Sequence, residues 1–322
     1  MSNRMDRRDF LKTSAALSGA AAFAMGPDAA GDTSTGGNTE SRDMPTGRIG
    51  DLEVSRLISG GNLIGGWAHA RDLDYVSSLM THYNTPDKIL ETLKLMEEHG
   101  IDTIIASLRG SSLDVLHRYW DEMDGSIKWI HQAKASPDRP VQDIKRAADN
   151  GASAAYIHGG VADRLVRNGR HGFLGRSMER IKKQGIPGGI GAHNLDVIVA
   201  SETAGYDPDF YMKTLHHHDY WSCADPQQLP EVIDNGKRDN YWARRPQETI
   251  RFMRQVETPF IAYKVLAAGA IPPNEGFRYA FENGADFICV GMFDWQVAED
   301  ARLARKVVSE IRGSGRGRPW RA

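Results

Sequence analysis

The chain has 322 residues, of which 40% are hydrophobic and 25% charged, a composition typical of a globular protein with a sizeable core. Its formal net charge of -2 gives no electrostatic reason to expect nucleic acid as a partner. The two cysteines, Cys223 and Cys289, are too few for a disulfide framework and form no CxxC pair, which argues against redox chemistry on sulfur.

The N-terminal segment has the features of an export address. The stretch RRDFLK at residues 7–12 precedes a weakly hydrophobic run rich in alanine and glycine that ends near Met25. This order resembles a twin-arginine signal, which we place at residues 1–26 and which implies the twin-arginine export machinery as a partner and a periplasmic location. The run is too short for a confident membrane span, so we expect no transmembrane domain. Residues 27–45 are rich in Gly, Ser, Thr and Asp and predict a flexible linker.

From Val54 onward, eight short apolar runs alternate with amphipathic stretches at the spacing of repeated βα units. The predicted strands cover residues 54–61, 100–107, 126–136, 152–160, 186–194, 210–218, 259–270 and 285–293. The predicted helices cover residues 86–100, 141–151, 177–185 and 246–256, and several end in a glycine that suits a helix C-cap.

Eight such units predict a closed (β/α)8 TIM barrel over residues 46–312. An open doubly wound sheet is the alternative, but the glycines of residues 59–66 lack the GxGxxG spacing and a following helix. We expect the basic segment 313–322 to be a solvated tail.

In such a barrel the chemistry lies at the carboxyl ends of the strands, and three successive strands end in histidine. The fourth ends at His158, the fifth at His193 and the sixth at residues 216–218, three histidines in a row. Because side chains alternate along a strand, either His217 alone or His216 with His218 faces the barrel mouth. We favour His217, together with an inward Lys213, and predict a divalent metal held by His158, His193 and His217.

Lysines within strands are the second chemical signal. Lys134, Lys213 and Lys264 fall in strand runs, where an unpaired ammonium group is costly to bury. Lys264 therefore either meets a carboxylate, for which Asp294 after the last strand is the predicted partner, or serves chemistry as a base or Schiff-base nucleophile. A purely structural ion pair is the alternative.

Two long connections, residues 65–86 and 220–246, carry aromatic side chains that suit the CH faces and hydroxyl groups of a sugar. The candidates for binding a sugar-like small molecule are these loops' Trp67, His69, Tyr220, Trp221, Tyr241 and Trp242, together with Asn194 after the fifth strand. Loop packing is the alternative role for these side chains.

From about Thr46 to Val307 the order of motifs resembles the aldo-keto reductase superfamily, a family of NADP-using (β/α)8 barrels. The similar segments are TGRIGDLEVSRLISGGNLIGG, AYIHGG, GIGAHN, AYKVLAAG and VGMFDWQVAED. The resemblance implies that Lys134 and His158 correspond to the catalytic lysine and histidine of the family, and that Asn194 corresponds to a residue contacting the nicotinamide amide.

The chain also departs from the family at two catalytic positions and in the cofactor-binding segment. Ile105 stands where the family has its catalytic Asp, Asp102 lies three residues early, and no nearby Tyr can be the proton donor. Residues 290–300 also lack the family's basic stretch for the adenosine phosphate. Ordinary carbonyl reduction would therefore lack its general acid.

Three classes of function remain. The first is a metal-assisted isomerase, epimerase, lyase or hydratase acting on a sugar or another small polar carbonyl compound, with Lys264 and Asp294 polarising the substrate and moving protons. The second is an oxidoreductase with tightly bound NADP, in which His158 and Lys134 are retained and His193 donates the proton. The third is a non-catalytic carbohydrate-binding barrel, and a Schiff-base aldolase using Lys264 or Lys213 is a further alternative.

Overall fold

The computed structural model describes residues 43–62, 64–71, 73–107, 112–134, 142–225, 242–312 and 315–322. All of these residues belong to one compact unit, Ser41–Ala322. The predicted signal peptide and residues 27–42 of the predicted linker lie outside the described residues. None of the described helices combines the length and the apolar character that crossing a bilayer requires.

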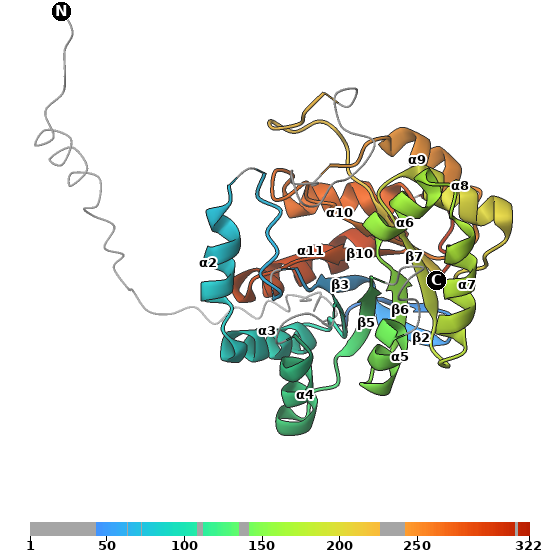
Figure 1. Ribbon diagram of the computed structural model, residues 1–322. Coiled ribbons are helices and arrows are strands. Elements are labelled where there is room, and N and C mark those ends of the chain that lie inside the picture. The colour runs from blue at the N-terminus through green and yellow to red at the C-terminus, as the bar shows by residue number, and fades with distance from the viewer. Residues whose placement is uncertain are drawn as a thin grey trace, which may run out of the picture. The chain divides into compact units, whose positions relative to one another are not determined.

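Eight parallel strands form a closed barrel, which confirms the predicted fold (Figure 1). The strands are β3 (Leu57–Gly60), β4 (Thr103–Ala106), β5 (Lys128–Ala133), β6 (Ala154–Ile157), β7 (Gly188–Ala192), β8 (Phe210–Thr214), β9 (Phe260–Tyr263) and β10 (Phe287–Val290). The ring closes where β10 pairs in parallel with β3, Cys289 opposite Ile58. Each strand lies within one of the eight predicted runs.

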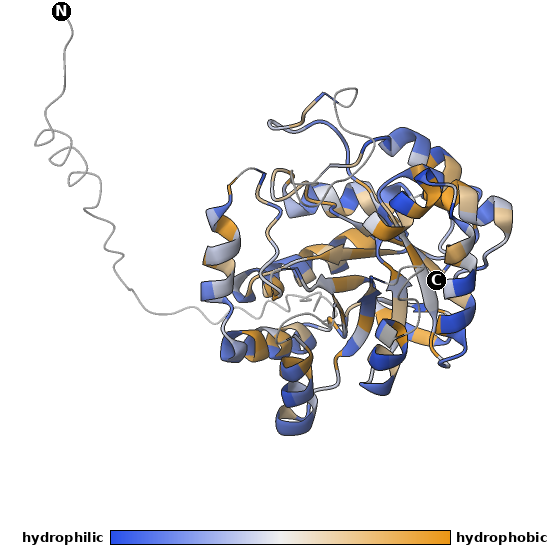
Figure 2. Ribbon diagram, in the orientation of Figure 1, coloured by the Kyte–Doolittle hydropathy of each residue, from blue (hydrophilic) through white to orange (hydrophobic). Residues whose placement is uncertain are grey.

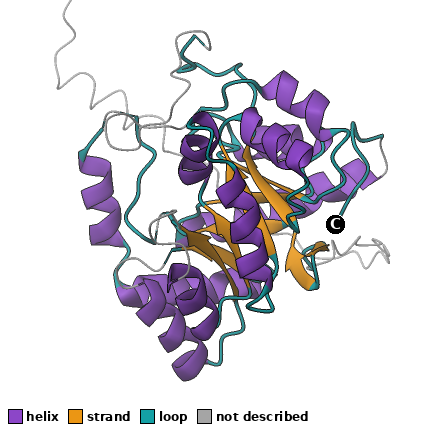
Figure 3. Cartoon of the chain, turned by 45° about the vertical axis from the view of Figure 1, so that its right-hand side comes forward, coloured by secondary structure: helices purple, strands orange, loops and turns teal. Residues whose placement is uncertain are grey.

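Helices surround the strands on the outside of the barrel (Figure 3). They are α2 (Tyr75–Tyr83), α3 (Pro86–Glu98), α4 (Ser112–Met123), α5 (Gln142–Asp149), α6 (Gly159–Arg167), α7 (Gly172–Lys182), α8 (Leu195–Ala204), α9 (Pro246–Met253), α10 (Pro273–Glu282) and α11 (Asp294–Arg312). Hydrophobic residues follow the strands and hydrophilic residues cover the outer helix surfaces (Figure 2). The predicted helices correspond to α3, α5, α7 and α9.

Helix α3 shows how local sequence determines an element. The Thr85 side chain accepts a hydrogen bond from the Lys88 amide. Pro86 occupies the first turn, where an N–H group would have no acceptor within the helix, so its lack of an N–H costs no hydrogen bond. The helix then buries Ile89, Leu90, Leu93 and Met96 against the barrel.

The amino-terminal end of the barrel is covered by an antiparallel hairpin of β1 (Thr46–Ile49) and β2 (Leu52–Ser55). Ile49 and Val54 from this hairpin join the barrel's interior cluster of side chains. This end is therefore packed shut, and chemistry is left to the carboxyl ends of the strands.

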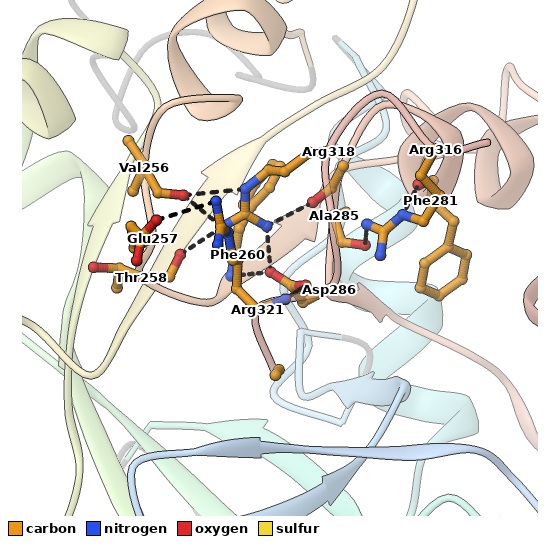
Figure 4. Close-up of polar contacts among 12 residues, drawn as sticks. Val256, Glu257, Thr258, Phe260, Phe281, Ala285, Asp286, Arg316, Arg318 and Arg321 are labelled. Carbon is orange, nitrogen blue, oxygen red and sulfur yellow. Dashed lines mark hydrogen bonds and ion pairs between the residues drawn. The ribbon is translucent and has the colours of Figure 1, made fainter. Parts of the chain in front are cut away.

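The basic tail also packs on this end, so the predicted solvated tail is wrong. The Arg318 side chain is fully buried and forms an ion pair with Asp286 Oδ2 at 2.6 Å (Figure 4). Its guanidinium also donates to the carbonyl oxygens of Val256, Thr258 and Gly284, which precede β9 and β10. Arginine's forked donors thus satisfy carbonyl groups in the segments before these strands, and this role is invisible in the composition of the tail.

Candidate active site

The interior cluster shows which residues of each strand point toward the barrel axis. It includes Ile130, Tyr156, Met212 and Ile261. Two residues beyond Tyr156 and Ile261 the alternation brings His158 and Tyr263 to the same side, at the carboxyl end of the barrel. His193 follows β7 at this end, with its ring centroid 6.3 Å from that of His158 and 5.6 Å from that of Tyr263. We call His158, His193 and Tyr263 the mouth cluster.

A glycine makes this close approach possible. A Cβ atom at Gly159 would lie 2.9 Å from the Tyr263 hydroxyl and 3.0 Å from two ring atoms of His193. Real Cβ atoms do not tolerate such distances, so any side chain at this position would push the cluster apart. The second residue of the HGG motif is therefore required by the packing of the mouth cluster.

The imidazole of His158 caps α6. Its Nδ1 accepts a hydrogen bond from the Gly160 amide at 3.1 Å, so the neutral ring carries its proton on Nε2. Burial, followed by the charges of His193 and Lys134, lowers the pKa of His158 to about 3. At neutral pH this histidine is therefore a neutral hydrogen-bond donor through Nε2.

His193 has the opposite tautomer. Its Nδ1 lies 2.7 Å from Oδ2 of Asp163 on α6, and both side chains are only 5% exposed. Asp163 Oδ1 also accepts the amides of His193 and Asn194, at 3.2 and 3.0 Å, which fixes the carboxylate. Nδ1 therefore carries the proton and Nε2 keeps its lone pair.

The charge state of His193 is set by its surroundings. Burial, followed by the positive charge of Lys264, lowers the pKa of His193 to about 4, although Asp163 acts in the opposite direction. The ring is therefore neutral near pH 7. Helix α6, which packs beside β7, thus holds both imidazoles, one by its first turn and one through Asp163 (Figure 1).

Tyr263 is the third member, and the sequence analysis missed both it and Asp163. Its hydroxyl donates to the Ala192 carbonyl oxygen at 3.3 Å, and burial raises the pKa of Tyr263 well above its ordinary value. It is therefore a protonated donor beside the histidines. Its position two residues after the inward Ile261 was the signal that could have identified it.

Two lysines follow the carboxyl ends of strands, Lys134 after β5 and Lys264 after β9. The Lys264 Nζ lies 5.8 Å from the ring centroid of Tyr263, and the Lys134 Nζ lies 5.6 Å from that of Trp67. Asp294, the predicted partner of Lys264, is engaged at the start of α11. It accepts hydrogen bonds from the Tyr83 hydroxyl at 2.7 Å and from Lys88 Nζ at 3.2 Å. The predicted pairing of Asp294 with Lys264 is therefore wrong.

The histidine triplet is arranged in the phase that we did not favour. Phe210 and Met212 point into the barrel, so His216 continues the inward row. Its Nδ1 donates to the Lys264 carbonyl oxygen at 2.8 Å and its Nε2 accepts the Ala243 amide at 3.0 Å. Burial lowers the pKa of His216 to about 3. Both nitrogens are used, and His216 is a neutral structural link between two loops.

The other triplet members face elsewhere. His217 Nε2 lies 3.1 Å from Glu275 Oε1 and its ring packs on Tyr279, both on α10, so the preference for His217 is wrong. His218 Nε2 lies 2.6 Å from the Ala243 carbonyl oxygen.

Lys213 lies on the outward row of β8, contrary to our preference. Its buried ammonium donates to the carbonyl oxygens of His193 and Thr214 and to the Thr214 hydroxyl, at 2.7, 3.0 and 2.9 Å. Burial lowers the pKa of Lys213 to about 7. Three acceptors match its three N–H groups, so it supports the His193 backbone from outside the barrel.

The predicted metal ligands are not gathered. Within the described ranges, no group of three or more His, Cys, Asp or Glu side chains is placed to hold a metal ion. His217 is turned toward Glu275 on α10 and does not join His158 and His193. The donors present do not fit the predicted site, and we derive no step through a metal.

The loop aromatics divide into two groups. Trp67 and Trp221 are 54% and 85% exposed, whereas Trp242 is only 6% exposed and does not offer a face to a ligand. Tyr220 packs edge-on against His216, with ring centroids 5.7 Å apart. Tyr241 lies outside the described residues.

Arg71 ties the loops over the mouth together. Its guanidinium donates to the Ser222 hydroxyl at 2.7 Å and to the carbonyl oxygens of Ala267 and Ala268 at 3.1 and 3.3 Å. It also lies 5.7 Å from the ring centroid of Trp221. The loop after β3 is thereby fastened to the loops after β8 and β9.

Comparison with known proteins supports the fold and the export address. Residues 4–24 match the family of twin-arginine translocation pathway signal sequences. No curated protein matches the chain. Among solved structures, a putative aldo-keto reductase from Pseudomonas aeruginosa is 15% identical, with 84% of this chain and 99% of that chain covered and a TM-score of 0.56.

The chain has an aldo-keto-reductase-like barrel. A Gox0644 mutant in complex with NADPH is 10% identical, covers 83% of this chain and 93% of its own, and has a TM-score of 0.53. A mandelate oxidase variant with 2-hydroxy-phenylacetamide is 13% identical, covers 85% and 78%, and has a TM-score of 0.51. Identities this low establish the fold alone.

The barrel's likeness to NADP-using enzymes raises the question of whether this chain fits that cofactor. Residues 290–300, where the family binds the adenosine phosphate, contain Asp294, Glu299 and Asp300 but no lysine or arginine. Asp294 in the first turn of α11 and Glu299 in the same helix place negative charge at this segment. These residues do not fit a phosphate, and we derive no step through a nicotinamide.

Proposed function

We propose that the protein is an exported enzyme that moves a proton on the carbon next to a carbonyl group of a small, sugar-like substrate. The reaction class is isomerisation, epimerisation, or elimination or hydration through the same enolate. One observation carries the proposal: two neutral imidazoles of opposite tautomer, His193 buried and His158 half-buried, stand with ring centroids 6.3 Å apart at the barrel mouth. One ring offers a lone pair and the other offers a proton.

The roles follow from these tautomers. The substrate carbonyl oxygen accepts a hydrogen bond from His158 Nε2, and the Tyr263 hydroxyl is a second donor beside it. His193 Nε2 removes the proton from the neighbouring carbon, and Asp163 stabilises the imidazolium that forms. Negative charge develops on the carbonyl oxygen, where a fixed donor is most effective in a site that excludes water.

The two product classes differ only in the following step. Transfer of the proton from His193 to the former carbonyl carbon, while the proton of the neighbouring hydroxyl passes to the former carbonyl oxygen, gives an isomer. Protonation of the opposite face of the original carbon by water, with loss of the His193 proton to solvent, gives an epimer. Departure of a hydroxyl group on the next carbon as water, with the proton held by His193, gives an elimination, and its reverse is a hydration. The exposed rings of Trp67 and Trp221 support a sugar-like substrate, and the export signal supports a periplasmic location.

A second candidate is an oxidoreductase with tightly bound NADP. It is favoured by the barrel's likeness to a protein solved in complex with NADPH and by the neighbouring positions of His158 and Lys134. Release of nicotinamide from the denatured exported protein, read by absorbance and fluorescence, separates this candidate from the first.

The proposed function is tested by solvent exchange. The exported protein is incubated in D2O with a panel of aldoses, ketoses and sugar acids, and deuterium incorporation next to the carbonyl is followed by NMR, with metal content measured on the same sample. We expect incorporation without added nicotinamide, and its loss in His193→Gln. His171→Gln is the matched control, because His171 contacts Tyr206 away from the mouth cluster.

The outcomes separate the candidates. Exchange that survives His193→Gln contradicts the proposal. Saturable sugar binding without exchange by any substrate indicates a carbohydrate-binding barrel instead.

A further inference from the structure

A glutamine faces the inside of the barrel one layer below the mouth cluster. Gln132 lies on β5, two residues beyond Ile130, which belongs to the interior cluster. In the parallel register of β5 and β6 its partner is Tyr156, another member of that cluster (Figure 1). His158 follows Tyr156 by two residues on the same side. The Cα atom of Gln132 therefore lies about 7 Å along the strands beneath the level of His158.

This glutamine is open to the barrel mouth. Between Trp129 and Ala133 on β5, Gln132 is the one residue that is half-buried, and the others are buried. The amino-terminal end of the barrel is filled by Ile49 and Val54 of the β1–β2 hairpin. An inward side chain can therefore meet solvent only from the carboxyl end, where the mouth cluster lies.

The Gln132 amide is held in one orientation by a buried tyrosine. Its Nε2 donates a hydrogen bond to the Tyr156 hydroxyl at 2.8 Å. Tyr156 is 2% exposed, and its ring packs against Phe210 with the centroids 6.3 Å apart. Among the described residues, Oε1 and the second N–H of this amide have no hydrogen-bond partner. The anchor thus leaves one acceptor and one donor for a ligand.

A second polar group lies at the same level on the neighbouring strand. Ser107 follows β4, two residues beyond Ile105, and Ile105 is an interior residue that pairs with Ile130. Continued by two residues, this register brings Ser107 level with Gln132. Ser107 is half-buried, and its hydroxyl has no hydrogen-bond partner in the part of the chain that the structure describes. Neither this hydroxyl nor the Gln132 oxygen is among the enclosed polar atoms, so both are open to solvent.

The chemistry of these two groups selects a hydroxyl group as their ligand. A sugar hydroxyl can donate to Gln132 Oε1 and accept from the amide N–H or from Ser107. A carboxylate or a phosphate ester can only accept, so its oxygens would face the Oε1 acceptor without a bond. A methylene group would displace water and leave both side chains without a partner, which is costly in a partly buried site.

We infer that Gln132 and Ser107 form a subsite for a hydroxyl group of the substrate, on a carbon that is not adjacent to the reacting one. The inference rests on the proposed function, since it assigns the substrate of the same site: a neutral sugar that carries a free hydroxyl group at its far end. Loss of that hydroxyl group should weaken binding by about five- to a hundredfold.

Four variants test the subsite. Gln132→Leu keeps a similar volume and removes both hydrogen-bonding groups, and Ser107→Ala is a smaller change that gives the same test if the larger one impairs folding. Tyr156→Phe keeps the ring and releases the amide. Gln184→Leu is the matched control, because Gln184 is also half-buried and its Nε2 donates to the Arg180 carbonyl oxygen at 3.4 Å, beside α7 on the outside of the barrel.

The experiment is titration calorimetry of the full exported protein with glucose, galactose, mannose and fructose, followed by the monodeoxy analogues of the sugar that binds most tightly. In the wild type we expect one analogue, altered away from the carbonyl carbon, to bind about five- to a hundredfold more weakly than its parent. Gln132→Leu should bind parent and analogue equally, Ser107→Ala and Tyr156→Phe should narrow the difference, and Gln184→Leu should keep it. A glutamine with a purely structural role would instead lower Tm on mutation and leave the difference intact.

Three results would overturn the inference: none of the four sugars binds saturably, every monodeoxy analogue binds as tightly as its parent, or the difference persists in full in the Gln132 and Ser107 variants. Binding is measured without turnover, and His193→Gln should keep the difference. A difference that depends on Gln132, without any deuterium exchange in the wild type, would contradict the proposed function alone. Deuterium exchange that is unaffected by Gln132→Leu would contradict this inference alone.

Discussion

Replacing Asp163 by asparagine should reverse the tautomer of His193. In the native protein Oδ2 accepts the Nδ1–H at 2.7 Å, and Oδ1 accepts two backbone amides. An asparagine oxygen can keep the two amide bonds, which leaves the NH2 group facing Nδ1. A donor facing Nδ1 requires a lone pair there, and the neutral ring must then carry its proton on Nε2.

The size of the effect can be estimated from these contacts. The backbone bonds are preserved, so the free energy of unfolding should fall by only about 1–3 kcal/mol, the value of one hydrogen bond to a charged group. Proton abstraction loses its base altogether, so we expect turnover to fall by about 10²–10⁴-fold. Asp163→Ala removes the backbone bonds as well and should be the less stable variant.

Nitrogen NMR of the histidine rings tests this directly. We expect His193 in the wild type at pH 7 to be protonated on Nδ1 alone, and in Asp163→Asn on Nε2 alone, with His158 protonated on Nε2 in both. A wild-type ring protonated on Nε2 would refute the assigned roles. Unchanged exchange activity in Asp163→Asn, despite a reversed tautomer, would refute His193 as the base.

Three further predictions concern the supports of the site. Arg318→Met leaves the Asp286 carboxylate buried without its cation, so the free energy of unfolding should fall by about 3–5 kcal/mol and Tm by about 5–9 °C in calorimetry. The control Arg321→Ala changes a 27% exposed side chain and should lower the free energy of unfolding by under about 1 kcal/mol. Equal losses in the two variants would contradict this prediction. Arg71→Ala should speed amide hydrogen exchange across residues 264–270 by about tenfold, and unchanged exchange would show that the turn holds itself. Burial lowers the pKa of His216 from 6.5 to about 3, so as the pH falls the unfolded chain is protonated before the folded protein. The contribution of this group to stability is therefore complete above pH 6.5 and declines toward pH 3. Urea midpoints measured at pH 7, 5.5 and 4.5 should decrease in that order, and the decrease should be smaller in His216→Asn.

The barrel could be predicted because each of its strands is an apolar run that ends at a polar residue. Parallel strands covered by helices are buried on both faces, so each one is a continuous apolar run that can be recognised from a few neighbouring residues. For the same reason the sequence did not show which residues of β8 face the barrel axis. Phe210 and Met212 face the axis while Tyr211 and Leu215 face the helices, and all four are apolar and buried. When both faces of a strand carry apolar residues, the sequence does not show which face points toward the barrel axis.

Lys213 misled the prediction for a related reason. We took a lysine within a strand as a sign of the open, polar side, but its ammonium is buried outside the barrel among three oxygen acceptors. Two of these acceptors are carbonyl oxygens at the ends of β7 and β8, which exist as a group only after folding. The tail was misjudged likewise, because the carbonyl oxygens that receive Arg318 belong to segments about 30 and 60 residues away in sequence.

Of the candidate site, the sequence identified His158 and His193, which lie at strand ends. It did not identify Asp163, because a carboxylate within a predicted helix is normally expected to face solvent. Only the folded structure shows that His193 lies beside it. The roles of all these residues remain predictions. Their placement within one mouth follows from the barrel topology alone.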